Sequence, residues 1–105
     1  NPVNFLKQII TKKQIISMAA KKVIKFYASW CGPCKIYGKT WDKITPSYSD
    51  QAEFSSIDID KDTTGSANKY KIDSVPTTVL VREDGSTKLL EGRLTKNELT
   101  ELILS

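Results

Sequence analysis

The chain contains no histidine, only two cysteines, and no apolar run that approaches the length of a membrane-spanning helix. Without an imidazole, the Ser-His-Asp and Cys-His classes of hydrolase are excluded, together with most zinc sites. A four-ligand structural zinc site would need two carboxylates beside the two thiols, which is an uncommon set of ligands. A membrane span takes roughly 18–20 consecutive apolar residues. We therefore expect a soluble globular protein with no metal site and no membrane contact.

Two cysteines are also too few for the disulfide framework of a small secreted protein. The 105 residues, 39% of them hydrophobic, are the length of one domain. A chain of this size buries roughly 60–70% of the surface that it exposes when unfolded, so its core needs no covalent support. The sequence therefore predicts one domain over residues 1–105. It begins with Asn1 rather than Met, so earlier removal of an export leader stays open, although no leader pattern is visible.

Charge is unevenly distributed along the chain. Residues 1–43 contain nine lysines and a single acid, whereas residues 44–105 contain seven basic and eleven acidic residues. A basic half could contact nucleic acid or a membrane surface. The lysines are scattered, however, and the aromatic residues among them form no base-stacking motif. A solvated lysine face is the better interpretation, and we expect no nucleic-acid partner.

Apolar residues alternate along the chain between strand-like and helix-like spacing. A continuous, mostly apolar run predicts a buried strand at 23–28, and we expect further buried strands at 53–59 and 77–82. The Asp-Gly pair at 84–85 predicts a hairpin, so the strand near 87–91 should run antiparallel to the one before it. The remaining expected elements are a strand at 5–10, helices over about 11–19, 32–44 and 66–70, and a last helix that opens with a capping box at Thr95 and Glu98. This order gives an α/β sandwich around a mixed sheet, parallel first and antiparallel at its end.

The motif that carries chemistry is Trp30-Cys31-Gly32-Pro33-Cys34, at the change from a buried strand to a helix. Cys31 falls at the predicted helix N-terminus, where free N–H groups and the helix dipole stabilise a thiolate. The thiolate is the nucleophilic form of cysteine. Two intervening residues let both sulfurs come within bonding reach across the first turn, and a proline near the helix start costs no hydrogen bond. Trp30 can shield one side of the pair with an apolar surface.

Three structural interpretations compete with redox chemistry at this motif. A zinc half-site lacks its other half in this sequence, and a disulfide that closes so short a loop removes little chain entropy. A pair of inert buried thiols would not explain the position at a helix start. The strand before the motif and the helix after it favour redox chemistry.

Nearly the whole chain resembles the thioredoxin family. The matching residues are the Trp30–Cys34 motif, Phe26-Tyr27-Ala28 on the preceding strand, Lys35, the cis-proline loop Val75-Pro76-Thr77, the hairpin Gly85, and Gly92 before the last helix. The resemblance implies a thioredoxin-like fold, with a central mixed sheet of about five strands flanked by about four helices.

The resemblance also implies an activity, the reduction of protein disulfides by dithiol–disulfide exchange. Cys31, the more exposed thiolate, attacks the substrate disulfide, and Cys34 resolves the mixed disulfide. The only redox group is then the Cys31–Cys34 disulfide, with no bound cofactor. A flavoenzyme, an NADPH-dependent thioredoxin reductase, recharges such proteins. We expect a cytoplasmic monomer whose partners are proteins that contain disulfides.

Further site residues follow from the same resemblance. Gly32 and Pro33 shape the turn between the cysteines. If the bond before Pro76 is cis, the Val75 backbone can pair with an extended substrate segment beside Cys31. Trp30 and Gly92 complete the expected substrate-binding surface.

The chain departs from the family pattern at Lys25, where most members have a buried aspartate beneath the second cysteine that accepts its proton. The usual lysine partner of that acid aligns with Ser56. Lys25 either turns to solvent with only its stem buried, or stays beneath Cys34, where burial lowers its pKa and the neutral amine can accept the thiol proton. A protonated Lys25 would instead lower the cysteine pKa. Our hypothesis is a buried or half-buried lysine, since an unpaired core charge is costly.

Two alternative functions remain open on the same fold. One is an exported thiol oxidase or isomerase, which differs from a reductase in its reduction potential. The other is a binding module that uses the surface of Trp30 and Pro76 without redox chemistry. The acidic segment 58–62 is interpreted as a solvated turn, because it lacks the glycine and glutamate of a calcium loop.

Overall fold

The computed structural model of the chain describes residues 21–105. Its elements, in chain order, are β1 (Lys22–Tyr27), α2 (Gly32–Ile44), the 3-10 helix η1 (Thr45–Tyr48), β2 (Glu53–Asp58), α3 (Ser66–Lys69), β3 (Thr77–Val81), β4 (Thr87–Glu91) and α4 (Lys96–Leu104). The strand expected at 5–10 and the helix expected at 11–19 lie outside the described residues. The expected elements from residue 23 onward are all present, with ends that differ by at most one residue.

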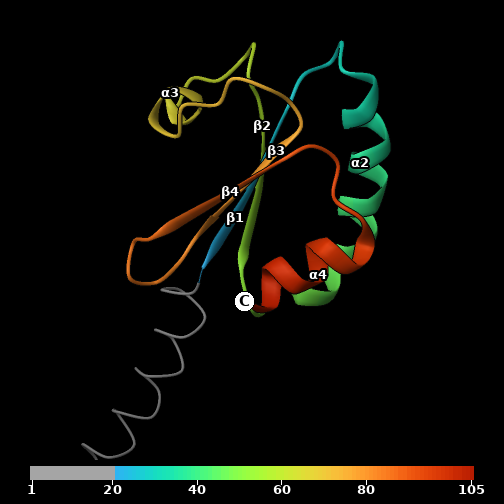
Figure 1. The fold of residues 1–105 in the computed structure, drawn as a ribbon, viewed down its shortest axis with the longest axis vertical. Coiled ribbons are helices and arrows are strands. Elements are labelled where there is room, and N and C mark those ends of the chain that lie inside the picture. The colour runs from blue at the N-terminus through green and yellow to red at the C-terminus, as the bar shows by residue number, and fades with distance from the viewer. Residues whose placement is uncertain (1–20) are drawn as a thin grey trace, which may run out of the picture.

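Four strands form one mixed sheet in the order β2-β1-β3-β4 (Figure 1). β1 and β2 are parallel, whereas β3 is antiparallel to both of its neighbours, β1 and β4. The predicted α/β class and the change from parallel to antiparallel pairing are therefore confirmed. Gly85 has a φ of 88° in the turn between β3 and β4, a conformation that glycine adopts without steric cost.

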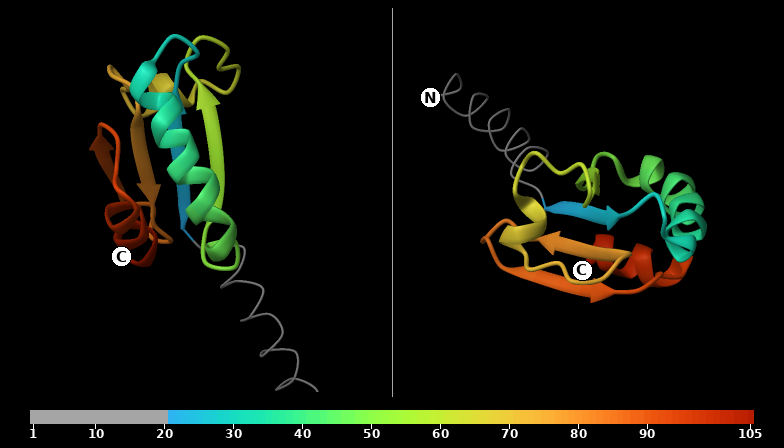
Figure 2. Two further views of the ribbon diagram at one scale, coloured as in Figure 1. Left: turned by 90° about the vertical axis from the view of Figure 1, so that its right-hand side faces the viewer. Right: turned by 90° about the horizontal axis from the view of Figure 1, so that it is seen from above.

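Helices cover both faces of the sheet (Figure 2). α2 and α4 lie on one face, where Val23 of β1 packs with Tyr37, Trp41 and Leu99. α3 lies on the other, where Ile24, Phe26 and Val79 form a second cluster. β1 lies between β2 and β3, and its residues from Val23 to Phe26 are buried, as its apolar run predicts.

β2 is less buried than we expected. Only Phe54, Ile57 and Asp58 of this strand are half-buried, and its other residues are exposed. The prediction of a strand buried on both faces was therefore wrong for β2. The reason is that β2 is an edge strand of the sheet that residues 21–105 form, so it has a pairing partner on one side only.

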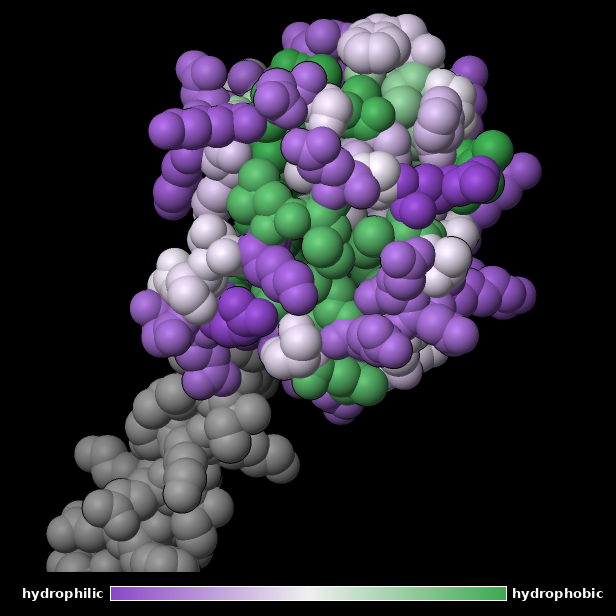
Figure 3. Space-filling model, in the orientation of Figure 1, coloured by the Kyte–Doolittle hydropathy of each residue, from purple (hydrophilic) through white to green (hydrophobic). Residues whose placement is uncertain are grey.

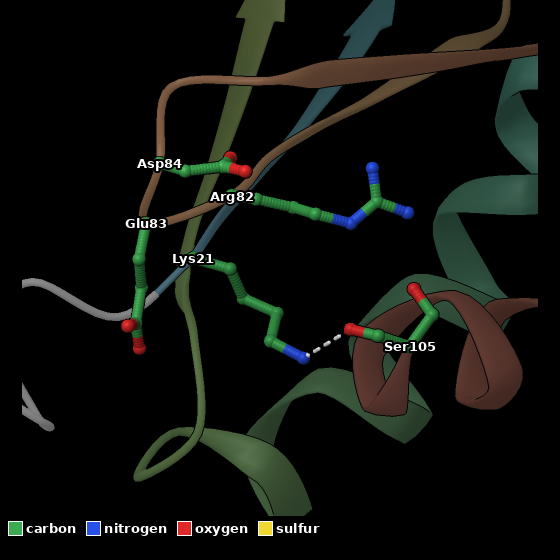
Figure 4. Close-up of a pocket in the computed structure, with 5 residues that line it drawn as sticks. All are labelled: Lys21, Arg82, Glu83, Asp84 and Ser105. Atoms are coloured by element: carbon green, nitrogen blue, oxygen red, sulfur yellow. Dashed lines mark hydrogen bonds between the residues drawn. The ribbon is translucent and has the colours of Figure 1, made fainter.

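Helix ends are fixed by local chemistry. α2 ends at Ile44, and Pro46 falls in the first turn of η1 that follows. α4 begins with the predicted capping box, in which the Thr95 side chain accepts from the Glu98 N–H and the Glu98 side chain accepts from the Thr95 N–H. At its other end, Lys21 Nζ lies 2.8 Å from the Ser105 carbonyl oxygen (Figure 4). A lysine there stabilises the carbonyl end of the helix dipole.

The surface is mainly polar, with apolar side chains gathered between charged ones on the face that carries β4 and α4 (Figure 3). The large hydrophobic residues that are exposed within the described part are Trp30, Ile36, Leu89 and Leu104. No helix within residues 21–105 has the length and apolar content to cross a membrane.

Candidate active site

The Trp30–Cys34 motif lies at the carboxyl end of β1, where the chain enters α2. Cys31 is the N-cap residue of α2, with extended backbone, and its Sγ accepts a hydrogen bond from the Cys34 N–H at 3.1 Å. Pro33 lies in the first turn, where no N–H is needed. The predicted position of a sulfur at the amide-rich end of a helix is therefore confirmed.

Cys31 and Cys34 are joined as a disulfide, with an S–S distance of 2.26 Å and Cα atoms 5.2 Å apart. Within residues 21–105, no group of three or more potential metal-ligating side chains gathers around these sulfurs or elsewhere. The pair is thus present in the oxidised form of a dithiol couple.

Both cysteines are equally buried, each with 5% of its surface exposed. The expectation that Cys31 is the more exposed of the two is wrong for this oxidised form. Ala28 packs against the pair, together with the half-buried side chains of Tyr27, Ile59 and Val75. The last of these comes from a distant loop, and its carbonyl oxygen lies 3.7 Å from the Cys31 Sγ.

The loop beside Cys31 carries Val75 and Pro76, whose connecting peptide bond is cis. Pro76 is buried and its carbonyl oxygen accepts a hydrogen bond of 2.8 Å from the Gly92 N–H. Gly92 has a φ of 89°, which glycine adopts without a side-chain clash. The segments around Cys31, Pro76 and Gly92 are far apart in the sequence. They lie together in the structure, as the family resemblance predicts.

Trp30 points outward, with 68% of its surface exposed, and its indole Nε1–H donates to Asp60 Oδ2 at 2.8 Å. Asp60 was not among the predicted site residues. The available signal was its place two residues after β2, because the carboxyl ends of the parallel strands β1 and β2 meet at one edge of the sheet. The acidic segment forms a turn here, since Asp58 accepts from the Asp60 N–H and Asp62 accepts from the Ala67 N–H.

Lys25 is buried, with 8% of its surface exposed. Its side chain leaves β1 on the α2 side, and its Nζ lies 5.4 Å from the centroid of the Tyr27 ring and 5.3 Å from that of the Trp41 ring. The residue opposite Lys25 on β2 is Ser56, as expected, and on β3 it is Thr78. The hypothesis of a buried lysine without its usual acidic partner is confirmed in position.

Burial lowers the pKa of Lys25 from its usual 10.5, because an ammonium loses hydration in the core. Attraction by the Asp42 carboxylate opposes this effect in part. The two aromatic rings also favour the charged form, since a cation over an aromatic face gains about 0.5–2 kcal/mol. The Lys25 ammonium therefore loses its proton more easily than that of a surface lysine.

A pocket of about 340 Å³ connects Lys25 with the disulfide. We call it the Lys25 pocket, and it is lined by Lys25, Tyr27, Ala28, Ser29, Cys34, Lys35 and Gly38. A Cβ atom on Gly38 would lie 3.8 Å from Lys25 Nζ, so the glycine is next to the amine. Sequence reasoning missed Gly38, although its spacing of four residues from Cys34 places both on one face of α2.

A buried hydrogen bond holds α2 against the sheet behind this pocket. The Tyr37 hydroxyl and the Thr78 Oγ1 are 2.6 Å apart. Burial raises the pKa of Tyr37 to about 12, with the Thr78 hydrogen bond opposing the rise. Neither residue was predicted to support the site, because their contact joins positions 41 residues apart.

Comparison with known proteins gives consistent results. The Thioredoxin family model matches residues 3–105. The chain is 36% identical over 90 residues to the thioredoxin of Mycoplasmoides gallisepticum, covering 86% of this chain and 88% of that protein. It is 32% identical over 100 residues to the thioredoxin of Mycoplasma genitalium, covering 95% and 93%. The solved structure of the germline-specific thioredoxin Deadhead of Drosophila melanogaster matches with a TM-score of 0.73 and 30% identity, over 90% of this chain and 89% of that one.

Proposed function

The chain belongs to the thioredoxin family and is a disulfide-reducing thiol–disulfide oxidoreductase with a thioredoxin-like fold, and from this premise we propose how its residues divide the reaction. Cys31 is the nucleophile and Cys34 the resolving thiol. The observation that carries this assignment is the hydrogen bond from the Cys34 N–H to the Cys31 Sγ at the first turn of α2. An N-cap sulfur is stabilised as a thiolate by such an amide and by the helix dipole.

The reaction balances as a two-electron exchange. The Cys31 thiolate attacks one sulfur of a substrate disulfide, which forms a mixed disulfide and expels the other substrate sulfur as a thiolate that takes up a proton. Cys34 then loses its proton and attacks Cys31 Sγ, which releases the second substrate thiol and forms the Cys31–Cys34 disulfide. The substrate has gained two electrons from the cysteine pair and two protons, one equivalent to that lost by Cys34 and one from solvent, because Cys31 reacts as a thiolate.

Lys25 supports the second step in this proposal. Its neutral amine accepts the proton of Cys34 across the Lys25 pocket, which both residues line. Burial supports this role because it lowers the pKa of the amine, which favours the neutral form that accepts a proton. Gly32 and Pro33 keep the turn short enough for Cys34 to reach Cys31.

The substrate-binding surface consists of Trp30, Val75, Pro76 and Gly92. Trp30 is exposed, and the Val75 carbonyl lies beside the Cys31 sulfur, where an extended substrate strand could pair with the backbone. We infer that the substrates are proteins with accessible disulfides and that an NADPH-dependent thioredoxin reductase restores the dithiol. We also propose that the chain acts as a single-domain monomer in the cytoplasm, with no other cofactor, no metal and no nucleic-acid or membrane partner.

The test is a disulfide-reduction assay on a protein substrate with Cys31→Ser and Cys34→Ser compared with the unchanged chain. We expect both variants to lose turnover, and only Cys34→Ser to trap a mixed disulfide, at Cys31. A trapped species at Cys34 would reverse the assigned roles. Full biological activity of both variants would select the binding-module alternative, and a reduction potential in the range of the oxidants would select the oxidase or isomerase.

A further inference from the structure

The Lys25 pocket has an unusual balance of charge. Its charged lining groups are the amines of Lys25 and Lys35, and no carboxylate is among its lining residues. Tyr27 and Ser29 add hydroxyl groups that can donate hydrogen bonds. Lys35 is exposed, whereas Lys25 is more than nine-tenths buried. The pocket therefore has a buried amine, that of Lys25, and an exposed amine, that of Lys35, where it meets solvent.

The carboxylate that acts on Lys25 is that of Asp42, an exposed residue one helical turn after Gly38. Its attraction raises the pKa of Lys25, but this effect is smaller than the lowering caused by burial. The neighbouring strands contribute only neutral groups opposite Lys25, the hydroxyls of Ser56 and Thr78. A buried charge that is only partly compensated is costly, so an anion that reaches Lys25 gains more than it would at a surface lysine.

We propose that the Lys25 pocket is an anion site that takes one carboxylate group beside the redox-active cysteines, with the Lys25 ammonium as its partner and Lys35 at its mouth. The volume of about 340 Å³ accommodates a carboxylate with a short aliphatic stem. A bound carboxylate holds Lys25 protonated, because an adjacent opposite charge favours the charged form. In the proposed reaction a substrate carboxylate therefore aids binding before the attack of Cys31, and it leaves the pocket before the Lys25 amine takes the proton of Cys34.

The carboxylate could come from a small free acid or from an aspartate or glutamate side chain of a protein substrate. The second source would make the pocket a determinant of substrate class, since the pocket also includes Cys34 in its wall. This second source rests on the proposed function, whereas binding of a free carboxylate does not.

The first experiment measures binding without any redox turnover. Sodium acetate is titrated into the oxidised, isotopically labelled chain in low-salt buffer, and the side-chain signals of its lysines are followed by NMR across a pH series. We expect a saturable shift of the Lys25 signal and a higher pKa for that amine, with Lys39, exposed on α2 outside the pocket, as internal reference. A Lys25 signal that moves no more than that of Lys39 would rule out a site for free carboxylates.

The second experiment separates the two sources. Two disulfide-linked peptides, identical except for Glu or Gln beside one half-cystine, are reduced by the unchanged chain, by Lys25→Met and by the control Lys39→Met. A Glu preference of about fivefold that is lost only in Lys25→Met assigns the site to substrate carboxylates. Acetate binding with equal peptide rates assigns it to free carboxylates, and absence of both effects overturns it. Reduction of the Gln peptide by the unchanged chain reports separately on the proposed function.

Discussion

The hydroxyl groups of Tyr37 and Thr78 lie 2.6 Å apart in the core and join α2 to β3. Cys34 lies in α2, Cys31 is the N-cap residue of α2, and β3 begins directly after Pro76. This buried hydrogen bond therefore helps to hold the helix with the sulfurs in place relative to the loop beside them.

Tyr37→Phe removes one partner of this bond and leaves the Thr78 hydroxyl buried without it. We expect the free energy of unfolding to fall by about 1–3 kcal/mol, the cost of an unsatisfied buried group. Urea unfolding measures this change. The double variant Tyr37→Phe/Thr78→Val should recover part of the loss, because no polar atom then lacks a partner. Strictly additive effects of the two substitutions would contradict a direct coupling.

Lys25→Met tests how much the burial of the Lys25 amine lowers the free energy of unfolding. Because burial lowers the Lys25 pKa below 10.5, the unfolded chain binds more protons than the folded one between the lowered pKa and 10.5. The unfolding free energy of the unchanged chain therefore rises with pH across this window. We expect Lys25→Met to lack this rise and to be more stable on its acidic side by about 1–3 kcal/mol.

Unfolding in urea over a pH series measures both curves. Tyr37, whose pKa is raised to about 12, binds its proton longer in the folded state and lowers stability between about 10 and about 12 in both proteins. The difference between the two curves cancels this contribution and isolates Lys25. Parallel curves for the two proteins would contradict a lowered pKa of Lys25.

Asp60→Ala tests the bond that orients Trp30. The bond is exposed, so we expect unfolding free energy to change by less than about 0.5 kcal/mol. The Trp30 indole loses its acceptor, and turnover on a protein substrate should fall several-fold because the ring must be ordered anew on binding. The indole N–H signal in NMR and a turnover assay measure the two effects. Asp50→Ala, an exposed acid in a turn, is the control, and equal turnover of both variants would rule out a role for this bond.

Gly38→Ala tests the space beside Lys25. The added Cβ would lie 3.8 Å from Lys25 Nζ, which is ordinary van der Waals contact, so no neighbour has to move. Replacing a glycine inside α2 should therefore raise stability by about 0.5–1 kcal/mol. Thermal unfolding should show a Tm higher by about 2–8 °C. A lower Tm would mean that α2 lies closer to β1 than the glycine contact indicates.

What the sequence could predict depended on local chemistry. The Thr95 capping box, the start of α2 at the cysteine motif and the Asp-Gly hairpin were predicted correctly, because each is decided within a few residues. For the Lys25 side chain the sequence left two options, exposure to solvent with a buried stem or burial beneath Cys34. The structure places it inside, where its amine lies beside Gly38 and the rings of Tyr27 and Trp41.

The missed features all join distant parts of the chain. The pairing of Trp30 with Asp60 depends on how β1 and β2 are aligned, and that of Tyr37 with Thr78 depends on the tilt of α2 on the sheet. The exposure of β2 reflects its place at the edge of the sheet that residues 21–105 form, together with its polar residues Glu53, Ser55 and Ser56. The equal burial of the two cysteines depends on the loop that carries Val75, which no pattern near position 31 reveals.

The hydrogen bond to the Cys31 sulfur links the redox state of the cysteines to the stability of the first turn of α2. Cys31 Sγ accepts the Cys34 N–H, so the acceptor is the atom whose oxidation state changes. A thiolate accepts a stronger hydrogen bond than a neutral disulfide sulfur. Opening of the first helical turn and oxidation are therefore linked in one thermodynamic cycle, and deuterium should replace the Cys34 amide proton more slowly in the reduced chain than in the oxidised one.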